Sequence, residues 1–247
     1  MARGVYSTSN YFEYAGGIVT AAPLTFACWI YPTAFTVVQY LMSVSRNDGG
    51  AAPDGFMLFI PTNAILSAQT VNNGSAATAT STALSANVWS HAAGVIASAT
   101  SRTAYRNGVA GTEETTSKTP ATTPDTTNIG ARILRDASVN NPATLTTIAE
   151  SAIWNAALTA AEILQLSLGY SPLFVRPESL VAYYPLIRVD SSGNEPDYMG
   201  GLTMVEQGTV AVATHARVFY PSSPIKLGVP AAAAPPAGNP WYAWQQM

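Results

Sequence analysis

Short stretches of this chain alternate apolar and polar residues, which is the pattern of β-strands that bury one face. The clearest stretch is 24–32, where the apolar side chains from Leu24 to Ile30 share one face and Trp29 and Tyr31 share the other. It ends at Pro32, which cannot donate a hydrogen bond to a neighbouring strand. The same pattern predicts further strands over 37–45, 55–60, 65–71, 88–96, 128–132 and 179–186.

Asn-Gly pairs separate several of the predicted strands. Asn73-Gly74 and Asn107-Gly108 fit two-residue hairpin turns, because both residue types tolerate the positive φ that these turns require. Residues 112–127 are rich in Thr and Pro and predict an extended loop. Many short strands joined in this way, without a strand-helix-strand rhythm, predict an all-β fold of two antiparallel sheets.

Residues 148–155 predict a strand with two apolar faces. Regular alternation places Ile148, Ala152 and Trp154 on one face and Ser151 and Ile153 on the other. A strand that is buried on both sides is the simplest explanation.

One short helix is expected directly after this strand, over 160–168. Thr159 and Glu162 have the spacing of a capping box, in which each side chain accepts a hydrogen bond from a backbone N–H at the helix start. Leu158 and Ile163 have the spacing of a hydrophobic staple, and Gly169 supplies the stop.

Composition narrows the class of protein. The 247 residues are 48% hydrophobic and 10% charged, which is enough to bury one substantial core. A formal charge of -3 and scattered Lys and Arg residues disfavour nucleic-acid binding. No run approaches the roughly 18 apolar residues of a membrane span, and no apolar segment of a secretory signal follows the start, so synthesis in the cytosol is expected. Cys28 is the single cysteine and is expected to be a small buried side chain.

The C-terminal stretch 221–247 has a different composition from the rest of the chain. It is rich in Pro and Ala and carries Trp241, Tyr242 and Trp244 near its end. Such a segment cannot fold alone, and burying each ring is worth roughly 1.5–3 kcal/mol. We therefore expect an arm whose three rings dock on a partner, with packing back onto its own domain as the alternative.

Several motifs together resemble the laminin-G-like jelly rolls of the concanavalin A-like lectin and glucanase superfamily. The motifs are Tyr11-Phe12-Glu13, 23–32, Trp89 to Val95, Tyr105 to Gly108, 128–132 and the strand and helix from Ile148 to Ile163. The resemblance implies a two-sheet antiparallel jelly-roll sandwich over 1–220, with 176–220 as a C-terminal extension and 221–247 as an anchoring arm. The family pattern has an acid where this chain has Ala149, which weakens a metal or ligand role at that position.

A further resemblance concerns residues 180–194. They are similar to a segment that follows such domains in bacteriophage and environmental viral proteins, which implies a non-enzymatic virion component, as a capsid decoration, head fibre or tail-associated protein. The implied partners are other virion proteins such as the major capsid protein, further copies of this chain and cell-surface glycans. The alternative is a stand-alone lectin-like carbohydrate-binding module, and the third hypothesis is a degenerate glycoside hydrolase.

Catalytic motifs are largely missing from the sequence. The Glu-x-Asp-x-x-Glu strand of retaining glycosidases does not occur, and His91 and His215 have no Cys partner or triad context. Glu150 has no second acid on its strand face. These observations predict a protein that is not an enzyme.

Calcium is the one cofactor that the resemblance keeps open. Asp48 and Asp54 flank a Gly-rich loop, and Asp136 lies near Asn140 and Asn141, so loop carboxylates and carbonyls could act as ligands. The alternative is that these are solvated turn acids. No other cofactor is expected.

Overall fold

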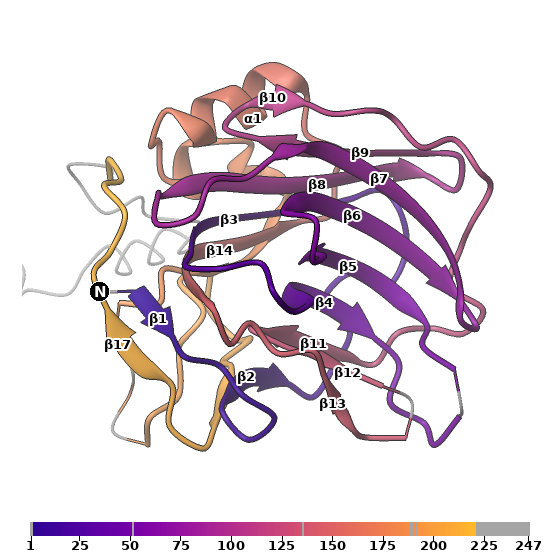
Figure 1. The fold of residues 1–247 in the computed structure, drawn as a ribbon, viewed down its shortest axis with the longest axis horizontal. Coiled ribbons are helices and arrows are strands. Elements are labelled where there is room, and N and C mark those ends of the chain that lie inside the picture. Colours follow the sequence, from indigo (N-terminus) through magenta and orange to yellow (C-terminus); the bar gives the residue numbers. More distant parts are fainter. Residues whose placement is uncertain (1, 51, 135, 188–189, 191, 221–247) are drawn as a thin grey trace, which may run out of the picture.

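The structure is a computed structural model that describes residues 2–50, 52–134, 136–187, 190 and 192–220. Two antiparallel sheets pack face to face and contain all the described strands except a small two-stranded hairpin (Figure 1). This confirms the predicted two-sheet jelly-roll sandwich with one short helix. None of the described helices is long and apolar enough to cross a membrane.

The first sheet has eight strands, with seven in one path and β15 beside β14. In path order these are β10 (Val109–Ala110), β9 (Ser101–Arg106), β8 (Ser90–Ser98), β3 (Leu24–Pro32), β14 (Thr146–Trp154), β1 (Ala2–Gly4) and β17 (Ala211–Ala213), with β15 (Leu180–Tyr184).

The second sheet has seven strands. In spatial order they are β16 (Val205–Gln207), β2 (Tyr11–Tyr14), β11 (Thr126–Ile129), β4 (Gln39–Ser45), β5 (Gly55–Ile60), β6 (Ile65–Asn72) and β7 (Ser75–Ala83). A small hairpin of β12 (Arg132–Ile133) and β13 (Val139–Asn140), the helix α1 (Ala160–Ser167) and the short 3-10 helices η1 (Pro172–Phe174) and η2 (Pro177–Ser179) complete the described elements.

The main hydrophobic core lies between the two sheets. Leu24, Phe26, Cys28 and Ile30 of β3 all point into it and are at most 1% exposed, as the alternation predicted. Burial raises the pKa of the Cys28 thiol, which keeps it protonated and unreactive. Each of the large apolar side chains contributes roughly 1.5–3 kcal/mol by leaving water.

Hairpin turns lie where the Asn-Gly pairs predicted them. Asn73 and Gly74 join β6 to β7 with φ values of 43° and 84°. By contrast, the predicted single strand 128–132 is interrupted. Gly130 adopts a φ of +81° against the Tyr6 ring, and the chain turns there from β11 into the β12–β13 hairpin.

The predicted facing of residues 148–155 is wrong, because β14 contains a bulge. Its pairing with β3 shifts between Ala149 and Ala152, and Glu150 in the gap has a φ of 56°. The extra residue reverses the alternation, so Ile148 and Ile153 both face the main core and Trp154 faces the opposite side.

Helix α1 covers the outer face of the eight-stranded sheet. Ile163 and Leu166 of α1 pack with Trp154 and Leu158 in a second buried cluster, and the Trp154 indole N–H donates to the Val175 carbonyl (2.9 Å). Both hydrogen bonds of the predicted capping box between Thr159 and Glu162 are present.

Strands from residues 176–220 join both sheets. β15 pairs with β14, β17 pairs with β1, and β16 pairs with β2. The intervening loop buries Glu195, whose Oε1 accepts a hydrogen bond from the Leu186 backbone N–H (2.8 Å) while Oε2 has no partner. The predicted boundary at residue 220 stays a prediction, because 221–247 lie outside the described residues.

We predict that Thr159→Ala lowers the free energy of unfolding by about 1 kcal/mol, because it removes the helix cap. Urea unfolding followed by circular dichroism measures this. Thr115→Ala in an exposed loop is the control, and an equal loss in both variants would contradict the capping role.

We also predict a pH-dependent stability that Glu195→Gln removes. Burial raises the pKa of Glu195 from 4.5 to about 7, so the folded state binds this proton more tightly than the unfolded state does. The stabilisation is complete below pH 4.5 and is lost as the pH rises to 7, an effect of about 3 kcal/mol at 1.4 kcal/mol per pKa unit. Unfolding free energies at pH 4.5 to 8 test this difference between wild type and variant. Glu178→Gln, at an exposed position, should leave the profile of the wild type unchanged.

Candidate functional site

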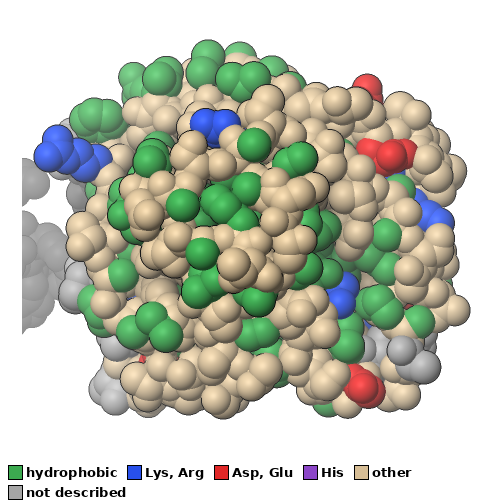
Figure 2. All heavy atoms as spheres, viewed as in Figure 1, with side chains coloured by type: hydrophobic (Ala, Val, Ile, Leu, Met, Phe, Trp, Pro, Cys, Tyr) green, Lys and Arg blue, Asp and Glu red, His purple; other side chains and the backbone are tan. Residues whose placement is uncertain are grey.

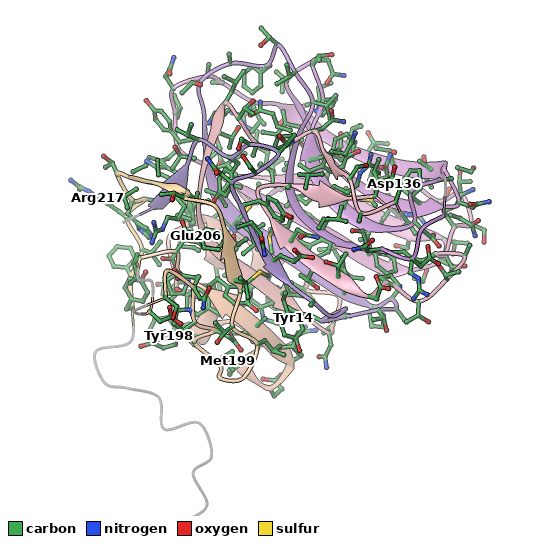
Figure 3. All side chains as sticks on the ribbon, turned by 90° about the horizontal axis from the view of Figure 1, so that it is seen from below. Tyr14, Asp136, Tyr198, Met199, Glu206 and Arg217 are labelled. Carbon is green, nitrogen blue, oxygen red and sulfur yellow. The ribbon has the colours of Figure 1, made fainter. Side chains whose placement is uncertain are left out.

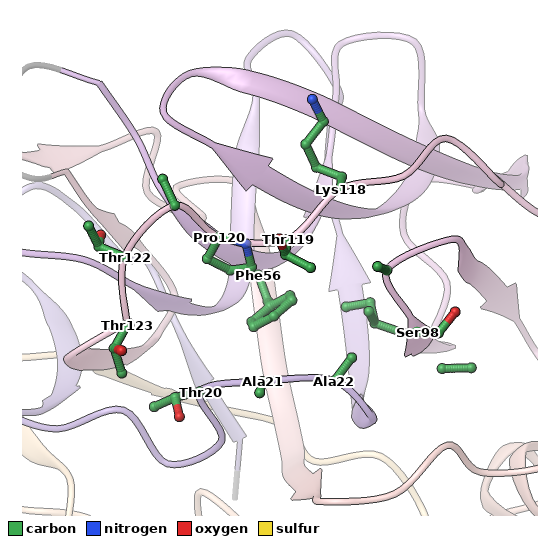
Figure 4. Close-up of a pocket in the computed structure, with 14 residues that line it drawn as sticks. Thr20, Ala21, Ala22, Phe56, Ser98, Lys118, Thr119, Pro120, Thr122 and Thr123 are labelled. Atoms are coloured by element: carbon green, nitrogen blue, oxygen red, sulfur yellow. The ribbon is translucent and has the colours of Figure 1, made fainter.

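A pocket of about 470 Å³ lies where the long loop before β11 passes the ends of β5 and β8 (Figure 4). This volume falls in the range of small-molecule sites. The lining consists of Thr20, Ala21, Ala22, Phe56, Ile96, Ala97, Ser98, Ala99, Lys118, Thr119, Pro120, Ala121, Thr122 and Thr123.

The pocket combines one aromatic ring with small polar groups. Phe56 projects between the segment 20–22 and the loop 118–123 (Figure 4). Threonine hydroxyls and backbone groups from these two segments surround it. Lys118 is the only charged residue of the lining, and its side chain points away from Phe56 to donate to Ser75 Oγ (2.8 Å).

Asp54, directly before β5, holds one wall of the pocket in place. Its side chain is 1% exposed, and both carboxylate oxygens accept hydrogen bonds from the loop. The backbone N–H of Ala121 donates to Oδ1 (2.9 Å), while the backbone N–H and the hydroxyl of Thr122 both donate to Oδ2 (2.8 Å each). A buried carboxylate with three donors fixes the loop at this point.

Arg102 of β9 binds the same loop nearer its start, at Thr116 and Lys118, whereas Asp54 binds it at Ala121 and Thr122. Its guanidinium donates to the backbone carbonyls of Thr116 (2.9 Å), Ala99 (2.6 Å) and Lys118 (3.3 Å). Arg102 is fully buried, and this burial lowers its pKa. Two buried side chains of opposite charge therefore support a pocket wall whose one charged residue is Lys118.

The pocket can bind a neutral solute, and Lys118 is the one charged side chain of its lining. No Asp, Glu, His, Cys or Tyr lines it, so a nucleophile with an adjacent base is absent from this lining. Hydroxyls and backbone amides provide hydrogen bonds, and Phe56 provides an apolar surface.

The three aspartates that the sequence suggested as calcium ligands each have protein partners. Asp48 forms an ion pair with Arg46 (3.1 Å), and Asp136 accepts hydrogen bonds from the backbone and hydroxyl of Ser138. Asp136 lies on the opposite side of the molecule from Tyr198 and Met199 (Figure 3). Within the described chain, no group of three or more His, Cys, Asp or Glu could hold a metal. The calcium role of Asp48, Asp54 and Asp136 stays a prediction.

Trp241, Tyr242 and Trp244, which the sequence suggested as partner-anchoring residues, lie outside the described residues. Their role also stays a prediction.

Glu150 forms a second polar cluster, on the outer face of the eight-stranded sheet. Its carboxylate is 2% exposed, accepts hydrogen bonds from the hydroxyls of Tyr183 and Tyr220, and lies 3.0 Å from His215 Nε2. Burial lowers the pKa of His215, but the Glu150 carboxylate and the backbone carbonyls of Ala216 and Pro185 outweigh it, so the pKa is raised and an ion pair is favoured. The cavity beside Glu150 measures only about 10 Å³, so the cluster has no room for a substrate.

Sequence reasoning missed the pocket and this cluster. Glu150 gave one signal, since an acid in the middle of an apolar strand needs partners when buried. Arg102 and Phe56 gave none, because their neighbours in space lie in other strands and loops.

The comparisons with known proteins agree with this fold. A family model described as the concanavalin A-like lectin/glucanases superfamily matches residues 6–164, a segment that contains the whole pocket lining. Among curated proteins, no sequence matches the chain.

Solved structures share the fold at low sequence identity. A candidate carbohydrate-binding protein from Bacteroides ovatus is 18% identical with a TM-score of 0.62, and the match covers 88% of this chain and 61% of that one. The CBM40 domain of the Ruminococcus gnavus IT-sialidase, solved with α2,3-sialyllactose, is 15% identical with a TM-score of 0.51, over 67% of this chain and 97% of that one. A heptameric pentraxin from Limulus polyphemus is 15% identical with a TM-score of 0.51, over 65% and 76% of the two chains.

The family match extends over more than half of the residues, and the two antiparallel sheets have the architecture of that family. The chain belongs to the concanavalin A-like lectin/glucanases superfamily.

Proposed function

We propose that this protein is a non-enzymatic, lectin-like carbohydrate-binding domain and that the pocket around Phe56 is its binding site. The observation that carries the proposal is the lining itself. It combines an aromatic ring with hydroxyls and backbone amides, and its one charged side chain, Lys118, is hydrogen-bonded to Ser75.

The chemistry of a neutral sugar matches this lining. A pyranose ring presents C–H groups on its faces and hydroxyls around its edge, so it can contact an aromatic side chain and make several hydrogen bonds at once. Charged side chains are few and scattered over the face of the molecule in Figure 2, which removes electrostatic attraction as the basis of binding. The proposed ligand is therefore an uncharged glycan.

The pocket is also prepared for binding before a ligand arrives. Asp54 and Arg102 fix the loop 116–122 through backbone hydrogen bonds, so little conformational freedom is lost when a glycan enters. Rigid support of this kind raises affinity without contact between the supporting residues and the ligand.

The structural neighbours are consistent with the proposal, but at this sequence identity they support only the shared fold. The Bacteroides protein is described as carbohydrate-binding, and the CBM40 domain was solved with a bound sugar, but both are below 20% identical to this chain. The matched segment spans about three fifths of the Bacteroides protein, so that protein's overall role does not transfer.

The virion role expected from the sequence has less support than glycan binding. It depends on residues 180–194 and on Trp241, Tyr242 and Trp244, and none of the similar structures named above is a virion protein. Placement in a virion, with capsid proteins or copies of this chain as partners, stays a prediction.

We predict that Ala97→Trp blocks the pocket and weakens glycan binding at least about tenfold, or about 1.4 kcal/mol. Ala97 is exposed at the pocket, so an indole fills the mouth without entering the core. Glycan arrays identify a ligand, and isothermal titration calorimetry then compares the variants. The control is Ala161→Trp on the exposed side of α1, which should bind like the wild type. Equal affinity of the pocket variant and the control would reject this site, and failure of the wild type to bind any glycan would reject the function.

We also predict that Asp54→Asn weakens the same binding although Asp54 does not line the pocket. The amide group faces backbone donors of Ala121 or Thr122, which costs about 1–3 kcal/mol and loosens the loop. Hydrogen exchange at residues 116–123 should become faster together with the loss of affinity. Asp136→Asn, in an exposed loop, is the matched control. Unchanged exchange in Asp54→Asn would contradict the supporting role.

A further inference from the structure

Exposed apolar side chains gather on one surface beside α1. They are Leu164, Leu168, Tyr170, Phe174 and Phe219, with exposed fractions of 47%, 61%, 47%, 46% and 66%. We call this set the aromatic patch. Figure 2 shows hydrophobic side chains along the upper edge of the molecule, where α1 lies in Figure 1.

The patch differs from the rest of the surface in its residue types. Leu164 and Leu168 lie one helical turn apart. The ring of Tyr170 lies beside the rings of Phe174 and Phe219, with centroid separations of 6.2 Å and 6.3 Å. The patch contains every exposed Leu and Phe of the described chain, whereas the other large exposed hydrophobic residues are six valines, Tyr198 and Tyr220. A concentration of this kind marks a surface that another apolar group covers.

The backbone route of residues 217–220 leads through this patch. The Phe219 N–H donates to the Gly169 carbonyl (2.7 Å), and its carbonyl accepts from the Ser171 N–H (3.0 Å). The Tyr220 hydroxyl donates to the buried Glu150 carboxylate. The chain therefore leaves the described structure at the edge of the patch.

We propose that the aromatic patch binds Trp241, Tyr242 and Trp244 of the same chain. The chemistry of the two surfaces matches, since the patch residues are apolar and the sequence from Leu227 to Met247 contains no charged residue. Aromatic pairs add about 0.5–1.5 kcal/mol each to the burial of apolar area.

Chain length favours the same molecule over a second copy. The 20 residues 221–240 can reach up to about 70 Å when fully extended, which is ample to return to a patch beside Tyr220. A tether of this length gives an effective concentration in the millimolar range, well above that of a second copy in dilute solution. The patch is therefore an internal docking surface for the C-terminal rings.

Disulfide crosslinking of the full chain tests the proposal without altering any ring. Gln165→Cys places a thiol at an exposed position of α1 next to Leu164 in sequence, and Gln245→Cys places one next to Trp244 in sequence. Cys28 is buried with a raised pKa and does not compete. The matched control combines Gln245→Cys with Thr36→Cys, which is exposed in the loop before β4 of the other sheet.

The expected result is an intramolecular disulfide between positions 165 and 245, with a yield about tenfold above the control pair in dilute solution. Adding Trp241→Ala and Trp244→Ala should reduce that yield to the control level. Three results would overturn the proposal: equal yields in both pairs, a yield that does not depend on the tryptophans, or disulfide-linked dimers in place of monomers. The last outcome would assign the patch to a second copy.

Discussion

The burial of the Glu150 carboxylate is the constraint on which both faces of the eight-stranded sheet depend. Glu150 occupies a bulge in β14 with a φ of 56°, a conformation that costs free energy in a residue other than glycine. The bulge turns Ile148 and Ile153 toward the main core and Trp154 toward α1. Regular alternation would place Ile148 on the same face as Trp154, whereas the bulge gives both isoleucines to the main core and the indole to the outer cluster.

The partners of Glu150 explain why the bulge persists. Tyr183 comes from β15, while His215 and Tyr220 come from the last described segment, and all three direct a polar hydrogen or a positive charge at the carboxylate. A buried carboxylate without such partners would cost several kcal/mol. The strained backbone and the network therefore stabilise each other, and the network also fixes residues 214–220 against the sheet.

Local patterns predicted the parts of the fold that depend on neighbours in sequence. The strand 24–32, the Asn73-Gly74 turn and the cap at Thr159 need only alternation, positive φ or a three-residue spacing. The bulge at Glu150 was missed because the pattern of period two does not reveal an extra residue.

The supports of the pocket were missed for a related reason. Asp54 looks like any turn aspartate in the sequence, and its partners Ala121 and Thr122 lie 67 and 68 residues away. A contact of that separation is set by the fold alone, so the candidate site could be found only after the sheets were in place.

The pocket and the partners of Glu150 lie in different parts of the chain: one part, residues 6–164, is shared with the family, and the other follows it. The pocket lining lies entirely within residues 6–164, the segment that matches the family, whereas Tyr183, His215 and Tyr220 lie beyond it. Glu150 lies within the matched segment 6–164, but the residues that contact its carboxylate come from the part of the chain after 164. A carboxylate at that position would face water without its cover, and the bulge would lose the interactions that offset its strain. The residues after 164 thus satisfy the buried Glu150 carboxylate on the outer face of the eight-stranded sheet, and the surface that they present beside α1 is a consequence of that cover.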